Sequence, residues 1–278
     1  MPVTQFTVLE DRGILAVRGD DRAAFLQGLV SNDTSKLAPR QALYAALLTA
    51  QGKYLHDFIM VGRDDAIWLD AEAARLADLK RRLSMYRLRA KVTIEELPDL
   101  AVAAVFGGDL PDIAVPDPRL PELGGRAILP RDTLRTTLAG LGLRETGFAE
   151  YDELRLSLGI PDGSRDLVVD KSILLEAGFD ELHGVDWQKG CYIGQELTAR
   201  TKYRGLIKKR LFPVRIDGTV PEPGTILTLG GKEAGEMRSS RGDMGLALLR
   251  LEHADAPLSV EGATVVATVP AWMRVEAD

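Results

Sequence analysis

The sequence contains only one cysteine, Cys191, among 278 residues. A single cysteine excludes an internal disulfide, and it cannot supply a cysteine-rich zinc or iron–sulfur site. We therefore expect no metal site in this chain. An excess of positive charge is also lacking, because 35 Lys and Arg stand against 41 Asp and Glu, a formal net charge of −6. No stable nucleic-acid complex is expected from this balance.

Long hydrophobic runs and common catalytic motifs are lacking as well. The apolar run at 101–106 is far too short to span a bilayer, and the N-terminus shows no export signal. These features predict a cytoplasmic protein with no membrane association. There is no phosphate-binding G-x-x-x-x-G-K-[ST] loop, no G-x-G-x-x-G fingerprint, no H-E-x-x-H and no G-x-S-x-G elbow.

What the sequence does have is the composition of a folded protein, with 45% hydrophobic and 27% charged residues. Apolar stretches at 44–48 and 55–61, separated by a glycine-containing connection, predict a β-hairpin, and 67–69 a third strand. Apolar residues at helical spacing predict a helix over 71–86, which with these strands would form a ferredoxin-like unit. After about residue 211, short apolar runs between Gly and Pro turns predict a small β-barrel.

The segment around Cys191 carries the strongest functional signal. Gly190 and Gly194 allow a tight turn that exposes the thiol, and the ammonium of Lys189 would favour the thiolate if it lies near the sulfur. One alternative is a buried cysteine that acts as a small hydrophobic residue. Another is a cysteine hydrolase, with Gln188 in the oxyanion hole and His56 or His183 as the base.

Residues 189–196 read K-G-C-Y-I-G-Q-E. This segment resembles the K-G-C-Y-x-G-Q-E signature of the YgfZ-type folate-binding proteins, which are linked to iron–sulfur cluster assembly and repair. The resemblance continues at 200, 203–205, 25–33 and 44–54 and covers most of the chain. That family is similar in fold to the aminomethyltransferase (T-protein) of the glycine cleavage system.

The resemblance implies an α+β fold, a three-domain ring of the T-protein type with a ferredoxin-like part and a C-terminal small β-barrel. We expect a folate-binding core from 1–41 and 107–208, a ferredoxin-like domain over 42–106 and a barrel over 209–278. The implied function is that of a tetrahydrofolate-binding accessory protein for iron–sulfur cluster assembly or repair. Its expected partners are folate and iron–sulfur client or assembly proteins, and a monomer is expected.

Tetrahydrofolate, or a one-carbon derivative of it, sets the demands on the implied pocket. The pterin edge presents an amino group beside a ring N–H, which suit one carboxylate, and the anionic tail suits Arg or Lys. Glu176 lies in a segment that resembles T-proteins, although it could equally be a surface glutamate. The candidate folate-binding residues are Asp57, Glu176, Gln195, Glu196, Arg200 and Tyr203. Cys191 and Lys189 are the candidate catalytic residues.

Two departures from the T-protein pattern favour a binding protein over a transferase. His56 replaces the first of two aspartates where T-proteins carry their catalytic aspartate, and Asp57 keeps the second position. Residues 146–150 are at best a remnant of a G-Y-T-G-E block. A tetrahydrofolate-dependent aminomethyl or one-carbon transferase stays as the alternative, so enzymatic activity is left open.

Basic residues gather in two stretches, at 80–91 and at 200–210. The first is interpreted as a solvated helix face, as charge runs usually are. The second directly follows the signature, so we expect it to take part in binding an anionic ligand.

Overall fold

A computed structural model describes residues 3–205 and 207–274 of the chain. Within these residues the chain forms two compact units, each assembled from separate stretches of sequence. Unit 1 consists of 1–48, 55–151 and 182–193, and unit 2 of 49–54, 152–181 and 194–278. The division into three domains predicted from the sequence stays a prediction.

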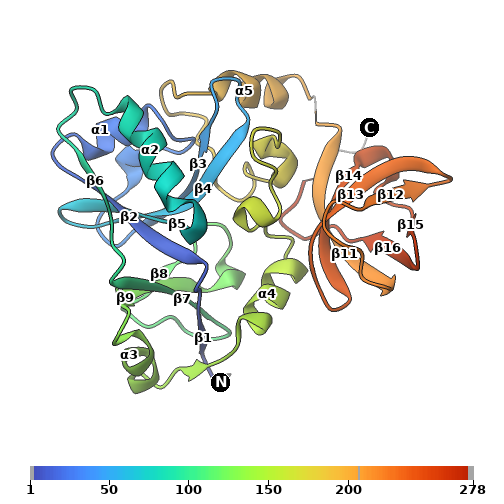
Figure 1. The fold of residues 1–278 in the computed structure, drawn as a ribbon, viewed down its shortest axis with the longest axis horizontal. Coiled ribbons are helices and arrows are strands. Elements are labelled where there is room, and N and C mark those ends of the chain that lie inside the picture. The colour runs from blue at the N-terminus through green and yellow to red at the C-terminus, as the bar shows by residue number, and fades with distance from the viewer. Residues whose placement is uncertain (1–2, 206, 275–278) are drawn as a thin grey trace. The chain divides into compact units, whose positions relative to one another are not determined.

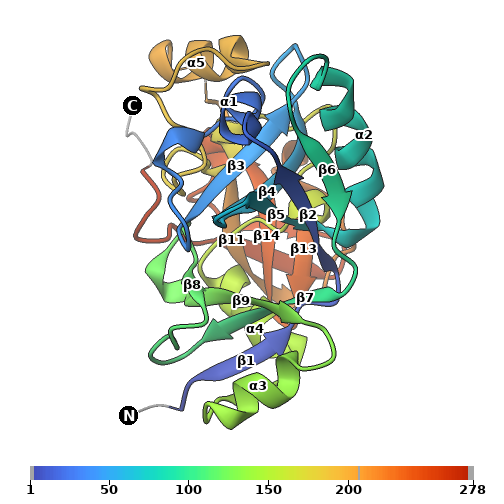
Figure 2. The ribbon, with the colours of Figure 1, turned by 90° about the vertical axis from the view of Figure 1, so that its left-hand side faces the viewer.

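The first sheet of unit 1 has the strand order β3-β4-β5-β2-β6. Its strands are β2 (Arg12–Arg18), β3 (Ala42–Leu48), β4 (Tyr54–Gly62), β5 (Ala66–Glu72) and β6 (Thr93–Glu96). Helix α2 (Leu76–Tyr86) lies beside β6 and packs on this sheet (Figure 2). The predicted hairpin and third strand are thus present.

The helix begins five residues later than the sequence predicts. Strand β5 continues to Glu72, because Glu72 pairs with Arg12 of β2 in the antiparallel ladder. A short 3-10 turn, Ala73–Arg75, then leads into α2. The partner that extends the strand lies 60 residues away in the sequence, so local periodicity does not reveal it.

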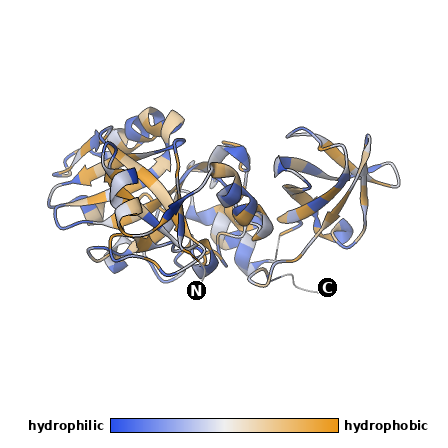
Figure 3. Ribbon diagram, turned by 90° about the horizontal axis from the view of Figure 1, so that it is seen from below, coloured by the Kyte–Doolittle hydropathy of each residue, from blue (hydrophilic) through white to orange (hydrophobic). Residues whose placement is uncertain are grey.

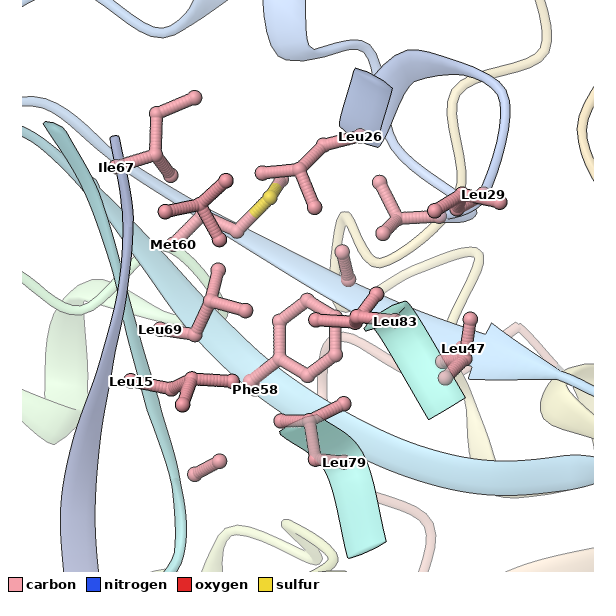
Figure 4. Close-up of a cluster of buried hydrophobic side chains, with 14 of the residues drawn as sticks. Leu15, Leu26, Leu29, Leu47, Phe58, Met60, Ile67, Leu69, Leu79 and Leu83 are labelled. Carbon is pink, nitrogen blue, oxygen red and sulfur yellow. The ribbon is translucent and has the colours of Figure 1, made fainter. Parts of the chain in front are cut away.

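The core of this part of unit 1 lies between the sheet and the helices. Leu76, Leu79 and Leu83 face the sheet at the i, i+3, i+7 spacing expected of an amphipathic helix. Figure 4 shows the ring of Phe58 among leucines of the neighbouring strands and of α2. Helix α1 (Arg22–Gln27) adds Leu26, which is fully buried in the same cluster.

The second sheet of unit 1 has the order β10-β1-β7-β9-β8. Its strands are β1 (Gln5–Val8), β7 (Leu100–Phe106), β8 (Val115–Pro116), β9 (Gly125–Pro130) and β10 (Arg144–Glu145). Strand β7 is a nearly continuous apolar run and lies in the middle of the sheet, as such runs commonly do. Helix α3 (Leu134–Gly140) contributes Leu134 and Leu138 to the core of this sheet.

Unit 2 ends in a closed barrel with the order β11-β14-β13-β12-β15-β16 (Figure 1). Its strands are β11 (Lys209–Gly218), β12 (Ile226–Leu229), β13 (Lys232–Arg241), β14 (Met244–Arg250), β15 (Leu258–Val260) and β16 (Ala263–Ala267). Hydrophobic and hydrophilic residues alternate along parts of these strands (Figure 3), as expected when one face fills the barrel. The predicted β-barrel is confirmed.

A buried ionic cluster fixes the barrel to the chain that leads to Glu176. Arg155, on helix α4 (Phe148–Ser157), bonds Asp152 at 2.7 Å, Asp166 at 2.6 Å and the Ser239 hydroxyl at 2.7 Å. Asp166 also accepts the Ser239 N–H of β13 at 3.0 Å. The charges are paired and hydrogen-bonded, which is the condition under which charges are tolerated in a protein interior.

The remaining helical elements of unit 2 include α5 (Gln195–Tyr203) and the 3-10 turn η5 (Leu174–Ala177). No helix within 3–205 and 207–274 is long and apolar enough to cross a membrane.

Candidate functional site

The cysteine of the signature is at the surface. Residues 189–194, here called the signature loop, run from unit 1 towards α5, and the Cys191 side chain is exposed. Gly194 has φ +82°, a left-handed conformation that favours glycine, at the N-terminus of α5. The Ile193 N–H donates to the Gly28 carbonyl at 3.2 Å and ties the loop to the end of α1. The burial of Cys191 as a small hydrophobic residue is therefore excluded.

Lys189 anchors the signature loop through its ammonium group. Its Nζ donates to the backbone carbonyls of Gln27 at 2.8 Å, Val30 at 2.6 Å and Asn32 at 2.7 Å. An ammonium has three protons, so each is used by one carbonyl. The Nζ atom also lies 5.0 Å from the centroid of the Tyr192 ring. We call these three hydrogen bonds the Lys189 anchor. They bind the Lys189 side chain to the backbone at the end of α1 and just after it.

Burial lowers the pKa of Lys189 to about 8, against the opposing charges of Asp33 and Asp186. The ammonium is therefore held in a largely desolvated place, where its bonds to the three carbonyls compensate for lost water.

Two residues that were not predicted as site residues hold the same region together. The Asn32 amide donates to the carbonyls of Tyr44 and His183, both at 2.7 Å, and the Ser31 hydroxyl donates to the Gly184 carbonyl at 2.6 Å. Both residues belong to the segment 25–33, which carries part of the family resemblance. That resemblance is the sequence signal that could have identified them.

Asp57 and His56 are neighbours on β4 but contact different residues. Successive side chains of a strand point to opposite faces, and both side chains are buried. Asp57 accepts a hydrogen bond from the Tyr44 hydroxyl at 2.9 Å, whereas the His56 Nε2 lies 2.9 Å from the Asp78 carboxylate on α2. His56 is thus directed to α2 and does not share a face with Asp57.

Glu176 lies in unit 2, in the turn η5, where it lines a small cavity together with Ser172, Ile173 and Arg238. Its side chain is partly buried, and within the described part of the chain its carboxylate has no hydrogen-bond donor. Burial raises its pKa, and the charges of Lys53, Lys209 and Arg238 act in the opposite direction. Glu176 is therefore a desolvated carboxylate with positive charge nearby, which can accept hydrogen bonds from a ligand.

The other candidate residues share one helix of unit 2. Gln195 and Glu196 form the first turn of α5, and Arg200 and Tyr203 follow on the same helix. The Tyr203 side chain is 73% exposed and is not part of the core. The structure thus places Gln195, Glu196, Arg200, Tyr203 and Glu176 in unit 2, and Asp57, Lys189 and Cys191 in unit 1.

Half of the second basic stretch forms internal ion pairs. Lys202 pairs with Asp180, Lys209 with Glu233 at 3.7 Å, and Arg210 with Glu181 at 2.8 Å. These three cations are engaged within unit 2, so any anionic ligand has fewer free cations here than the sequence suggests.

The cysteine-hydrolase alternative has no support in the geometry. Over the residues that the structure describes, Cys191 has no hydrogen-bond or ionic partner, and His56 is bonded to Asp78 instead. The same residues hold no group of three or more His, Cys, Asp or Glu that could bind a metal ion.

Comparison with known proteins bears on both the fold and the family. Residues 208–275 match the family described as the CAF17 C-terminal beta-barrel domain. The chain is 36% identical to the mitochondrial iron-sulfur cluster assembly factor IBA57 of Mus musculus, covering 95% of this chain and 84% of that protein. The IBA57 of Homo sapiens matches with the same identity and coverage. The chain belongs to the IBA57 family.

The IBA57 relatives refine one expectation and correct another. The resemblance to YgfZ-type proteins is confirmed at the level of a family linked to iron–sulfur cluster assembly, and the named relatives are IBA57 proteins. The expected cytoplasmic location is wrong: the named relatives are mitochondrial, which points to mitochondria. A single cysteine excludes an internal disulfide but does not distinguish the cytoplasm from mitochondria.

The structure also resembles the glycine cleavage system aminomethyltransferase T from Bartonella henselae, with a TM-score of 0.77. The match covers 98% of this chain and 86% of that chain, at 14% sequence identity. The predicted T-protein fold with a C-terminal barrel is confirmed.

Replacing Lys189 by Met should lower the free energy of unfolding by about 3 kcal/mol, because three backbone carbonyls lose their donor. Urea denaturation measures the change. Lys171→Met, at an exposed lysine, is the matched control and should change stability little. Equal effects of the two substitutions would contradict the anchoring role.

The stability of the protein should also depend on His56 at mildly acidic pH. Burial lowers the pKa of His56 to about 4, below its ordinary value of 6.5, so the folded state holds fewer protons between these values. Stabilisation by neutral His56 is complete above pH 6.5 and is lost as the pH falls towards 4, an effect of about 3 kcal/mol. Unfolding curves of the wild type and His56→Gln across pH 4–7 should differ in slope; parallel curves would show that His56 does not titrate there.

Proposed function

We propose that this protein supports the assembly or repair of iron–sulfur clusters in client enzymes in mitochondria, and that Cys191 acts in this process. The observation that carries the proposal is an exposed cysteine in a loop fixed by the three bonds of Lys189. A reactive thiol needs access to its partner, and a fixed loop reduces the entropy lost when that partner binds. The IBA57 relatives are named as iron-sulfur cluster assembly factors, which supports this role.

We further propose that the protein binds tetrahydrofolate or a one-carbon derivative of it. The fit rests on Glu176, a partly buried carboxylate that lacks a donor in the described residues and has cations around it. Such a carboxylate suits the paired N–H groups of a pterin. Gln195, Glu196, Arg200 and Tyr203 are the further proposed contacts, all on α5 of unit 2. Asp57, in unit 1, stays a prediction from the family resemblance. Folate, when bound, supplies one-carbon chemistry, and these residues bind and orient it.

The His56 geometry disfavours a full aminomethyltransferase. In the place where T-proteins carry paired aspartates, this chain presents one carboxylate, Asp57, which accepts from Tyr44, while His56 is bonded on the other face. A transferase remains the second candidate because the fold is shared and Asp57 is kept. Formation of methylene-tetrahydrofolate from an aminomethylated donor would favour it.

Cells that lack the gene should lose the activity of an iron–sulfur enzyme and keep that of a cluster-free control enzyme. The wild type should restore the loss, and Cys191→Ser, at matched protein level, should not. Because the side chain is exposed, this substitution should leave the free energy of unfolding nearly unchanged.

No loss on deletion would contradict the assembly role. Full rescue by Cys191→Ser would keep that role and remove Cys191 from it.

Glu176→Gln should weaken tetrahydrofolate binding roughly tenfold or more, since a charge-assisted hydrogen-bond acceptor becomes a neutral one. Calorimetric titration of the intact protein measures the dissociation constant. Glu153→Gln, at an exposed glutamate of α4, is the matched control and should bind as the wild type does. The folate proposal fails if the wild type does not bind, and the role of Glu176 fails if both variants bind equally.

A further inference from the structure

The last residues of α2 and the turn that follows them expose an unusual set of side chains. Met85 is 55% exposed, Tyr86 41% and Leu88 89%, while Arg87 and Arg89 beside them are also exposed. Residues 85–89 are called the apolar–basic turn below. Single exposed apolar residues are normal on a protein surface, whereas neighbouring ones form a patch, and apolar patches rimmed by polar residues are typical of interaction sites.

The backbone holds Leu88 outward at a conformational cost. The Ala90 N–H donates to the Arg87 carbonyl at 2.7 Å, which closes a tight turn with Leu88 and Arg89 at its centre. Leu88 has φ +41°, in the left-handed region that Gly and Asn accept and that a bulky residue rarely adopts. Such strained positions concentrate at functional sites. A leucine is unfavourable for this backbone conformation, and its exposed side chain does not pack in the core.

The apolar–basic turn is firmly supported on both sides. Leu83 before it and Val92 after it are buried in the same core cluster. The Lys91 N–H donates to the Asp21 carboxylate at 2.7 Å. Gly19 packs so closely on the Lys91 carbonyl that a Cβ would lie 2.1 Å from its oxygen. The turn is therefore preorganised, and a partner would not have to order it on binding.

The apolar–basic turn also carries two positive charges that no acidic side chain pairs with among the described residues. Arg81 and Arg82, earlier on α2, bond Asp78 at 2.5 and 2.6 Å. Arg87 and Arg89, in contrast, have no ion pair within 3–205 and 207–274. In a chain with a net charge of −6, two such arginines beside a tyrosine and a methionine form a positively charged patch. Arg, Tyr and Met are the residues enriched in protein–protein interfaces.

We propose that the apolar–basic turn docks on an acidic protein surface, with Leu88 in an apolar pocket of that partner and Arg87 and Arg89 paired with its carboxylates. The proposal rests on the proposed function, because the partner would be an iron–sulfur client or assembly protein. A protein fits better than a membrane: stable membrane anchoring needs a large apolar face or two anchoring signals, and this turn offers one leucine with two partly exposed neighbours.

The test uses the same cells that lack the gene. Leu88→Asn removes the apolar contact and places at φ +41° a residue that tolerates it, so the fold should be unaffected. Iron–sulfur enzyme activity should fall at least threefold at matched protein level. Leu141→Asn, at a leucine that is 53% exposed in the same unit, should rescue fully. Arg87→Glu should lower the activity likewise, and Arg144→Glu should not.

A photo-crosslinking residue at position 88, compared with one at 141, identifies the partner. The captured protein is then purified, and its dissociation constant with the intact chain should rise at least tenfold for Leu88→Asn, with binding weakened by salt.

Three results would overturn the proposal. One is rescue by Leu88→Asn equal to that of the wild type, which would leave the proposed function intact. Another is an unchanged dissociation constant for that variant. The third is binding of the purified protein to vesicles of phosphatidylcholine with an anionic phospholipid that depends on Leu88, since this would assign the turn to membranes. Failure of the wild type itself to restore activity would instead refute the proposed function.

Discussion

The signature loop depends on one ammonium group that serves three backbone carbonyls. Lys189 binds Gln27, Val30 and Asn32, so the loop with Cys191 is tied to the chain leaving α1. Asn32 in turn binds the Tyr44 and His183 carbonyls, and Tyr44 donates to Asp57. A single set of hydrogen bonds therefore connects the signature loop to β3 and to the remaining aspartate of β4. The Lys189 ammonium thus has a structural role, and the loop that it holds exposes the Cys191 thiol.

The chain has the T-protein fold, including the closed barrel. His56 stands where the family resemblance implies the first of two aspartates, and its side chain is directed to Asp78 on α2. Glu176, in the turn η5, has a carboxylate that lacks a hydrogen-bond donor among residues 3–205 and 207–274. These features support the proposed function, in which the protein binds folate and does not transfer an aminomethyl group.

Much of the fold could be predicted from the sequence, because hydrophobic periodicity is a local property. The hairpin, the third strand and the C-terminal barrel all follow from it. The start of α2 could not be predicted, since Glu72 pairs with a residue 60 positions earlier. The partners of Lys189 lie about 160 positions earlier and are backbone atoms, which carry no sequence signal. The sequence predicts a solvated charged face over 80–91 and does not reveal the exposed Leu88. That exposure depends on the turn closed between Arg87 and Ala90 and on the distant Asp21, which binds the Lys91 N–H.

In the proposed function, the Lys189 anchor holds Cys191 in the conformation that iron–sulfur maturation requires. The most direct measurement is the activity of an iron–sulfur enzyme in cells that carry Lys189→Met, compared with cells that carry Leu138→Ala, a core variant expected to lose about 3 kcal/mol of stability elsewhere in unit 1. At equal protein levels we predict that Lys189→Met fails to rescue, as Cys191→Ser does, while Leu138→Ala rescues. Full rescue by Lys189→Met would show that the function of Cys191 does not depend on the Lys189 anchor.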